Sequence, residues 1–389
     1  MVAGHLQEKN GKFYAVLSYN DEFNKRKTKW INTGLPVKGN KKRAEEFLDE
    51  QRKNFYVPEK CQARGHANEL FADYLQWWLK VAKSSIALTT YCSYSQLVNS
   101  AIDPWFRKRN FLLREVTGAD IQDFYTEQLK RVSANTVIHY HAVIHRALKY
   151  AMNMDFIMVN PADKVECPKK EPFTGNFYDK DEINRLFTCV EGSVIELPVK
   201  LATFYGLRRS EVLGLKWSAV DFGNKTLSIN HTVTKCTVDG KSMIVARDTT
   251  KTRSSRRSLP LVSEFRDLLL RKREEQAELK RLCGRCYCND YAEYICVNEL
   301  GELLKPSYLT SEFSKVLKRN ALRPIRFHDL RHSCASLLLA NDVPLKQIQE
   351  WLGHSDFSTT ANIYAHLDVR AKQSSAQAIQ QDLGMRISC

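Results

Sequence analysis

The stretch YGLRRSEVLGLKW, residues 205–217, places two adjacent arginines between two helical patterns. We expect one helix to end at Gly206 and the next to begin just after the arginines, with its apolar side chains turned inward. Arg208 and Arg209 then lie at a helix start, where free backbone N–H groups, the helix dipole and a guanidinium fork favour an anion. Glu211 is close enough in sequence to orient an arginine. Taken alone, the pair also fits a solvated surface.

Two later segments add basic and histidine side chains. In DTTKTRSSRRSLPL, residues 248–261, the runs SMIVAR and SLPL read as strands, so we expect Lys251 at the tip of a hairpin. A lysine there can reach a phosphate or deliver a proton, although most lysines in turns are simply solvated. In FHDLRHSCASLLL, residues 327–339, His328 and Arg331 are three positions apart and share one face of a helix.

A fourth segment, WLGHSDFSTTANIYAH, lies near the C-terminus. A helix that begins at Pro344 is expected to end at Gly353, directly before His354. Ser358 is a suitable N-cap for a short helix that carries Tyr364. Helical periodicity alone allows this tyrosine either a place in a core or a reactive role.

The four segments together supply two arginines, a lysine, two histidines and a tyrosine, and this set requires no metal. It suits phosphoryl transfer on a phosphodiester. Arginines neutralise the non-bridging oxygens, and a tyrosine becomes a covalent nucleophile once its phenol loses the proton. Histidine accepts that proton or holds the phosphate, and lysine protonates the leaving alkoxide. His328 and His332, with Asp329 between them, also resemble a zinc motif, but no third ligand follows them.

Length and composition point to a basic protein of several domains. The chain has 389 residues, which suggests two or three domains, and 43% of them are hydrophobic, enough for real cores. Lys and Arg total 59 against 44 Asp and Glu, a net charge of +15, which favours a polyanion such as nucleic acid. Ribosome binding or an unspecific basic surface is the alternative. We find no apolar run of about 18 residues and no secretory signal.

The eleven cysteines are expected to be reduced thiols. Four of them gather in CGRCYCNDYAEYIC, where only one Cys-x-x-Cys pair is present and a zinc site needs two. We expect free thiols there, with a zinc site as the alternative. His141 and His145 could likewise share a metal, but a polar helix face is the simpler interpretation. The clustered cysteines are Cys283, Cys286, Cys288 and Cys296.

Hydrophobic patterns divide the chain into four parts. Residues 1–58 are expected to form a small domain of three strands and a helix, and residues 64–165 a helical domain. Residues 160–176 hold three prolines and a Lys-Lys pair, which indicates a linker at 166–176, and residues 177–389 mix helices with strands. Two basic groups are candidate DNA contacts or solvated charges: Lys25, Arg26, Lys27 and Lys29 in a polar turn of the small β domain, and Lys169 and Lys170 in the linker.

The order of these segments resembles the tyrosine recombinases, also called phage-type integrases. GLRRSE, TKT…RRSLPL, HDLRHSCAS, LGHS and TTANIYAH match the boxes of that family over roughly residues 60–389. The small β domain in front makes the chain similar to integrases of Tn916/Tn1549-type conjugative transposons. The resemblance implies a mainly α, multidomain fold: an N-terminal three-stranded β plus helix domain, a helical SAM-like core-binding domain, and an α+β catalytic domain that ends in an exchange helix.

The resemblance also implies roles for individual residues. Tyr364 would be the nucleophile that forms a 3′-phosphotyrosine, and Lys251 the general acid. No cofactor or metal is needed, because the protein–DNA ester keeps the bond energy. The phosphate would be held by Arg208, His328, Arg331 and His354.

The partners implied are double-stranded DNA at core-type and arm-type sites, a homotetramer on two duplexes, and an excision accessory protein, with no membrane. The expected location is the bacterial cytoplasm, at the nucleoid. Two other readings are a DNA-binding regulator of the same fold that performs no strand exchange, and a type IB topoisomerase.

Overall fold

A computed structural model describes residues 3–20, 26–55, 65–170, 176–238, 240–248 and 256–353. The chain divides into two compact units, Met1–Glu171 and Pro172–Cys389, and the division falls inside the predicted linker. Within the described ranges, no helix combines the length and the apolar content that crossing a membrane requires.

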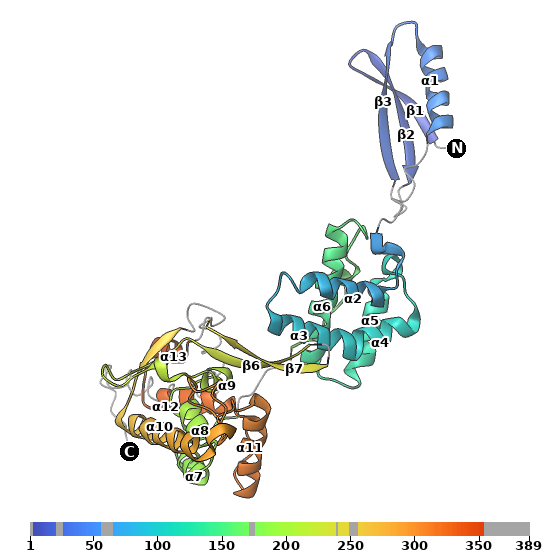
Figure 1. Cartoon of the computed structure of the whole chain (residues 1–389). Helices are drawn as coiled ribbons and strands as arrows, with labels where there is room; N and C mark the ends of the chain where they lie inside the picture. Colours follow the sequence, from blue (N-terminus) through green and yellow to red (C-terminus); the bar gives the residue numbers. More distant parts are fainter. Residues whose placement is uncertain are drawn as a thin grey trace, which may run out of the picture. The chain divides into compact units, whose positions relative to one another are not determined.

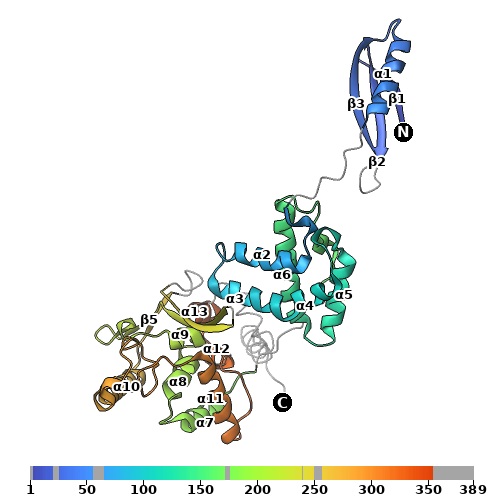
Figure 2. The same cartoon turned by 45° about the vertical axis from the view of Figure 1, so that its right-hand side comes forward.

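The first unit begins with an antiparallel sheet of three strands in the order β1-β2-β3 (Figures 1 and 2). Asn10 and Gly11 both have positive φ, 51° and 73°, and form the two-residue turn that joins the first two strands. Helix α1 packs on one face of the sheet over a small core of Ala15, Leu17 and Leu48. The elements are β1 (Ala3–Lys9), β2 (Lys12–Asn20), β3 (Arg26–Pro36) and α1 (Lys41–Asn54). The predicted composition of this domain is confirmed.

The rest of the first unit is helical, as predicted. Ser133 caps the longest helix, where its hydroxyl accepts a hydrogen bond from the backbone N–H of Thr136. The α-helices are α2 (Phe71–Ala82), α3 (Leu88–Leu97), α4 (Asp103–Arg109), α5 (Gly118–Leu129) and α6 (Ala134–Asn153). Short turns of other helix types are η1 (Gly65–Asn68), η2 (Val98–Ile102), η3 (Leu113–Glu115) and η4 (Pro161–Lys164).

The two histidines of α6 have separate partners. His141 Nδ1 lies 2.9 Å from the Tyr125 hydroxyl, and His145 Nε2 lies 2.8 Å from a carboxylate oxygen of Asp163. Burial, followed by the charge of His145, lowers the pKa of His141. Each histidine ring therefore has a hydrogen-bond partner of its own inside the helical domain.

The second unit builds one large core from helices around small sheets. Helices α8 and α12 pack against each other (Figure 1). Its helices are α7 (Lys180–Val190), α8 (Glu196–Phe204), α9 (Arg209–Leu213), η5 (Trp217–Ala219), α10 (Ser263–Cys283), η7 (Gly284–Cys286), α11 (Pro306–Arg319), α12 (Asp329–Ala340) and α13 (Leu345–Leu352). Its strands are β4 (Val220–Asp221), β5 (Thr226–Ile229), β6 (Thr232–Val238), β7 (Lys241–Arg247) and β8 (Arg257–Pro260).

The expected hairpin around Lys251 is wrong. Strand β7, which contains SMIVAR, pairs with β6 across a turn at Gly240, whose φ is +75°. Strand β8 pairs instead with β5 in a separate sheet of order β4-β5-β8. The run before Lys251 already has a nearer partner across a glycine turn, so the described strands before and after residues 249–255 belong to different sheets. Lys251 itself is outside the described residues.

The clustered cysteines are free thiols. Cys283 ends α10, Cys286 lies exposed in η7, and Cys296 is buried, where burial raises its pKa to about 12. In the described parts of the chain, no group of three or more His, Cys, Asp or Glu side chains is arranged to hold a metal ion.

Candidate active site

Arg208 is held at the start of α9 by Glu211. Arg208 is the N-cap residue, and its backbone N–H donates to Glu211 Oε2 at 3.0 Å. Its guanidinium Nη1 donates to Glu211 Oε1 at 2.6 Å. The same carboxylate thus satisfies an N–H that a helix start leaves without an intrahelical partner, and it orients the side chain. The expectation that Glu211 orients an arginine is confirmed.

Arg331, on α12, lies near Arg208 and Glu211 although it comes 123 positions after Arg208 in the chain. Its side chain is among the largest that are fully buried, and its Nη1 donates to the carbonyl of Gly206 at 2.6 Å. Burial, then the positive charge of Arg208, lowers the pKa of Arg331 to about 9, against the opposing effect of Glu211. The two arginines that the sequence separates are therefore electrostatic neighbours.

Gly206 is the backbone position that allows this approach. Its φ of +63° is a conformation that L side chains rarely adopt. A Cβ placed there would lie 2.2 Å from Leu352 Cδ2 and 3.3 Å from Cys334 Sγ. The close packing of α12 and α13 around this glycine directs its carbonyl toward Arg331, which explains why a helix has to stop here.

His328 lies at the start of α12, beside these arginines. Desolvation by the surrounding protein, then the charges of His332, Arg331 and Arg208, lowers the pKa of His328 to about 4, although the residue keeps exposed surface. A neutral imidazole can accept a proton or donate a hydrogen bond to a phosphate. Asp329, the acidic residue of the zinc alternative, is instead bound by the backbone N–H and the guanidinium of Arg326, both at 2.8 Å.

Three of the six predicted catalytic residues, Lys251, His354 and Tyr364, lie outside the described residues. The described chain ends next to the site, because Arg208 Nη2 donates to the carbonyl of Gly353 at 3.0 Å. Helix α13 ends at this glycine, whose φ is +68°, as predicted. His354 is therefore the next residue after one that Arg208 contacts.

Sequence reasoning missed a third arginine, Arg257. Its Nη2 donates to Glu211 Oε2 at 3.0 Å, and its side chain is only 6% exposed. A signal was present in RRSLPL: the two-residue period of a strand puts Arg257 on the same side as the buried Leu259. An arginine on the buried side of a strand requires an acidic partner.

The candidate DNA-contacting residues are exposed where they are described. Arg26, Lys27 and Lys29 lie along β3 and not in the expected turn, because the strand begins already at Arg26; Lys169 and Lys170 lie at the end of the first unit. Lys25 is outside the described residues. The neighbouring Trp30 is 45% exposed, with Lys9 Nζ 5.7 Å from its ring centroid. This sheet therefore offers both charge and an aromatic surface.

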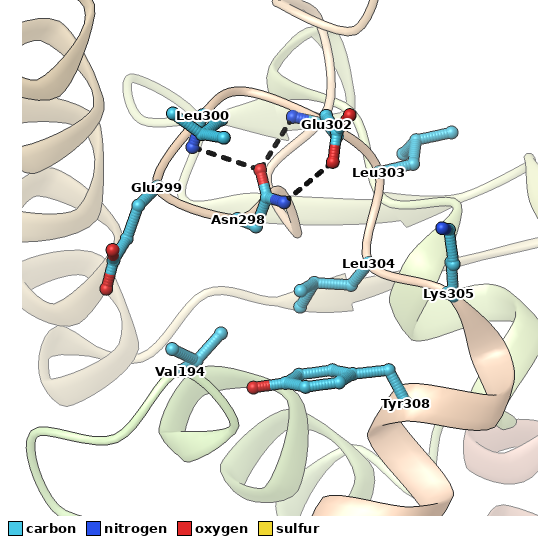
Figure 3. A pocket seen from close by; sticks show the side chains of 9 residues that line it. All are labelled: Val194, Asn298, Glu299, Leu300, Glu302, Leu303, Leu304, Lys305 and Tyr308. Atoms are coloured by element: carbon cyan, nitrogen blue, oxygen red, sulfur yellow. Dashed lines mark hydrogen bonds between the residues drawn. The ribbon is translucent and has the colours of Figure 1, made fainter. Parts of the chain in front are cut away.

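A cavity of about 390 Å³ lies elsewhere in the second unit, beside the loop that precedes α11 (Figure 3). Asn298 holds that loop, because its side-chain oxygen accepts from the backbone N–H groups of Leu300 and Glu302, at 3.1 and 2.8 Å. None of the arginines described above lines this cavity. The lining residues are Val194, Asn298, Glu299, Leu300, Glu302, Leu303, Leu304, Lys305 and Tyr308.

Two family models match the chain. The model described as "Phage integrase family" covers residues 176–370, half of the chain, and contains all the arginines of the site. The model described as "Phage integrase, N-terminal SAM-like domain" covers residues 70–129 in the helical domain.

Curated relatives and solved structures agree with this assignment. A "Tyrosine recombinase XerC-like" protein of Caldanaerobacter subterraneus subsp. tengcongensis is 29% identical over 277 residues, 68% of this chain and 71% of the relative. The "ICEBs1 integrase" of Bacillus subtilis is 25% identical over 85% of this chain and 88% of its own length.

Among solved structures, the Tn1549 transposon integrase in complex with a circular intermediate DNA shares the fold, with a TM-score of 0.64 at 17% identity. It covers 79% of this chain and 99% of that one. A lambda integrase tetramer bound to a Holliday junction has a TM-score of 0.59 at 17% identity, over 92% of this chain and 94% of that one. The chain belongs to the phage integrase family of tyrosine recombinases, enzymes that cleave and rejoin DNA.

Proposed function

We propose that this protein is a site-specific recombinase that integrates and excises a mobile element through a 3′-phosphotyrosine made by Tyr364. The observation that carries the proposal is the charge of the site. Three guanidiniums, those of Arg208, Arg257 and Arg331, surround a single buried carboxylate, that of Glu211. Burial raises the pKa of Glu211, but Arg257 and Arg208 outweigh it, so the pKa is lowered and the carboxylate is charged. An excess of buried positive charge suits a phosphodiester.

The chemistry follows from these charges. The Tyr364 hydroxyl loses its proton and its oxygen bonds to the scissile phosphorus, while the bond from phosphorus to the 5′ oxygen breaks. Lys251 gives that leaving oxygen a proton. Arg208, Arg331, His328 and His354 hold the phosphate as charge develops on its non-bridging oxygens. A 5′-hydroxyl of the partner duplex then attacks the phosphotyrosine and restores a phosphodiester.

The partner is double-stranded DNA. The net charge of +15 and the exposed basic strand β3 support phosphate contacts, so the affinity falls steeply with salt. We assign residues 1–58 to arm-type sites, residues 64–165 to core-type sites, residues 166–176 to the linker and residues 177–389 to catalysis.

Four copies act together on two duplexes, and an accessory protein directs excision. A lambda integrase tetramer bound to a Holliday junction, whose fold this chain shares, supports the first of these statements. The ICEBs1 integrase of Bacillus subtilis, a bacterial relative, supports action on the nucleoid in the bacterial cytoplasm.

A suicide substrate tests the nucleophile. A nicked duplex drawn from a pool of varied sequences, which loses a short fragment after cleavage, traps the covalent protein–DNA adduct of the wild-type chain. Tyr364→Phe should form no adduct while it binds the duplex as the wild type does. An adduct from the Phe variant would exclude Tyr364. Sequencing the DNA trapped on the wild type gives the site, and a wild type that traps no DNA would exclude the function.

A modified leaving group tests Lys251. Lys251→Ala should slow cleavage of the ordinary duplex by about 10²–10⁴-fold, the range that general acid catalysis supplies. A duplex with sulfur in place of the 5′ bridging oxygen releases a thiolate, which needs little protonation. Most of the loss should disappear on that duplex, whereas an equal loss on both would remove the general-acid role.

A further inference from the structure

Arg257 contacts the carboxylate of Glu211 on both oxygens. Its Nη2 lies 3.0 Å from Oε2 and its Nη1 lies 3.5 Å from Oε1. Glu211 has only 2% of its side chain exposed. Arg208 uses the same two oxygens, through its backbone N–H and its Nη1. One carboxylate is therefore shared between a helix start and a strand that lies 46 positions further along the chain.

The burial of Arg257 is costly. On β8 it pairs in register with Ile229, and two positions later Leu259 pairs with Leu227; all three of these apolar side chains are buried. An apolar side chain would satisfy this strand position, whereas removing a guanidinium from water costs several kcal/mol before pairing offsets it. Folding alone gives little reason for an arginine here.

What Arg257 changes is the freedom of the carboxylate. The terminal torsion of a glutamate is broad, so a carboxylate bonded from one side can still rotate. A second guanidinium that faces both oxygens fixes the plane of the group. Glu211 Oε1 then stays where Arg208 Nη1 meets it at 2.6 Å, and the remaining Nη2 of Arg208 is aimed at the carbonyl of Gly353.

We propose that Arg257 is a positioning residue of the recombinase: it fixes the Glu211 carboxylate, which aims Arg208 at the scissile phosphate. The inference rests on the proposed function, because it concerns the arginine assigned there to the phosphate. Arg257 need not touch the DNA. Its effect passes through Glu211 and ends on the charge that Arg208 places at the non-bridging oxygens.

The experiment uses the full chain and the attachment-site duplex recovered from the wild-type adduct. Arg257→Met removes the charge at similar length, and Arg257→Lys keeps the charge but loses the fork. The matched control is Arg256→Met, because Arg256 is the exposed neighbour whose Nη2 donates to the backbone carbonyl of Asp248 at 3.2 Å. Single-turnover cleavage is measured at saturating protein, beside DNA binding and the thermal midpoint.

A second substrate separates positioning from a structural defect. In this duplex a methyl group replaces one non-bridging oxygen of the scissile phosphate, so the group is neutral and needs less guanidinium charge. Arg257→Met should slow cleavage of the ordinary duplex by about 100-fold, the loss that a small misplacement causes, with unchanged binding. On the neutral duplex the loss should shrink to below about 10-fold. Arg257→Lys should recover part of the rate, and Arg256→Met should match the wild type.

Several results would overturn the inference. One is Arg257→Met cleaving the ordinary duplex at the wild-type rate; another is an equal loss on both duplexes, which marks a structural role. A third comes from the Glu211→Gln background. There Arg257→Met should add less than about 3-fold if it acts through Glu211, and a full additional loss would contradict that path. All of these tests require that the wild-type protein forms the covalent adduct. If the wild type forms no adduct, the result contradicts the proposed function and not this inference.

Discussion

Two glutamates of the catalytic unit each bind two cationic side chains, but one group is buried and the other is exposed to solvent. Glu211 pairs with Arg208 and Arg257 at 2% side-chain exposure. Glu312 on α11 pairs with Lys315 at 3.1 Å and Arg319 at 3.4 Å, where the cations are 56% and 68% exposed. Water screens the second group and leaves each charge nearly independent. In the first group each charge depends on the others.

The difference shows how the protein stabilises cationic side chains that are buried away from water. Exposed pairs contribute at most about 1 kcal/mol each. A buried charge without its partner costs far more, so Glu211 is needed even though it carries the wrong sign for a phosphate. The arginines that are proposed to hold the phosphate are thus themselves held by a buried acid. Four measurements, in order of decreasing expected effect, test this comparison.

The largest effect is expected from Glu211→Gln. The change removes the negative charge that Arg208 and Arg257 share, so the free energy of unfolding of the catalytic unit should fall by about 3–5 kcal/mol. Urea denaturation of the full chain, with hydrogen exchange of the α9 amides to report on this unit, measures it. A loss below about 1 kcal/mol would place Glu211 in the same class as Glu312.

The next effect is expected from Gly206→Ala. The added Cβ meets Leu352 at 2.2 Å, and the φ of +63° is unfavourable for alanine, so we expect a loss of about 2–4 kcal/mol. Gly11→Ala is the matched control, because its φ is +73° but no atom lies within 4 Å of the added Cβ. Its loss should stay near 1 kcal/mol. Equal losses at the two glycines would show that the packing around Gly206 is unimportant.

A smaller effect concerns pH. The folded pKa of His328, about 4, lies below its ordinary value, so between these two pH values the unfolded chain binds a proton that the folded chain does not. Stability should therefore be highest above pH ~6.5 and fall toward pH ~4, by on the order of 1 kcal/mol once solvent screening of the exposed ring is allowed for. NMR titration of the ring tests the sign, and an unshifted or raised pKa would contradict it.

The smallest effect is expected from Glu312→Gln. Both of its cations remain in contact with water after the change, so the free energy of unfolding should move by no more than about 0.5 kcal/mol. The same denaturation series measures it, and 1 M salt should remove most of the difference. A loss comparable with that of Glu211→Gln would end the contrast between the two glutamates.

Local signals predicted much of the fold. The stop of α13 at Gly353 depends on residues close in sequence, and it is confirmed. The same holds for the pairing of Arg208 with Glu211, since the two are three positions apart. Cap and turn chemistry needs no knowledge of the tertiary structure.

Contacts between residues that are far apart in the chain could not be predicted from the sequence. The wrong hairpin at Lys251 followed from joining two strands that are neighbours in the chain, whereas β8 pairs with β5. Arg257 was missed for the same reason: its acid lies on another element, 46 positions earlier. The carbonyl that receives Arg331 is 125 positions away. A charged residue at a buried strand position was the one local sign of such a contact.

The hydrogen bond from Arg208 to Gly353 has a consequence for the tyrosine. Tyr364 follows Gly353 by eleven residues, which span at most about 40 Å when fully extended. Gly353 thus sets an upper limit on the distance between the proposed nucleophile and the arginine that contacts this glycine. A separation of this size corresponds to a local concentration in the mM range. Chain length alone therefore keeps the proposed nucleophile within reach of the phosphate that Arg208 is proposed to hold.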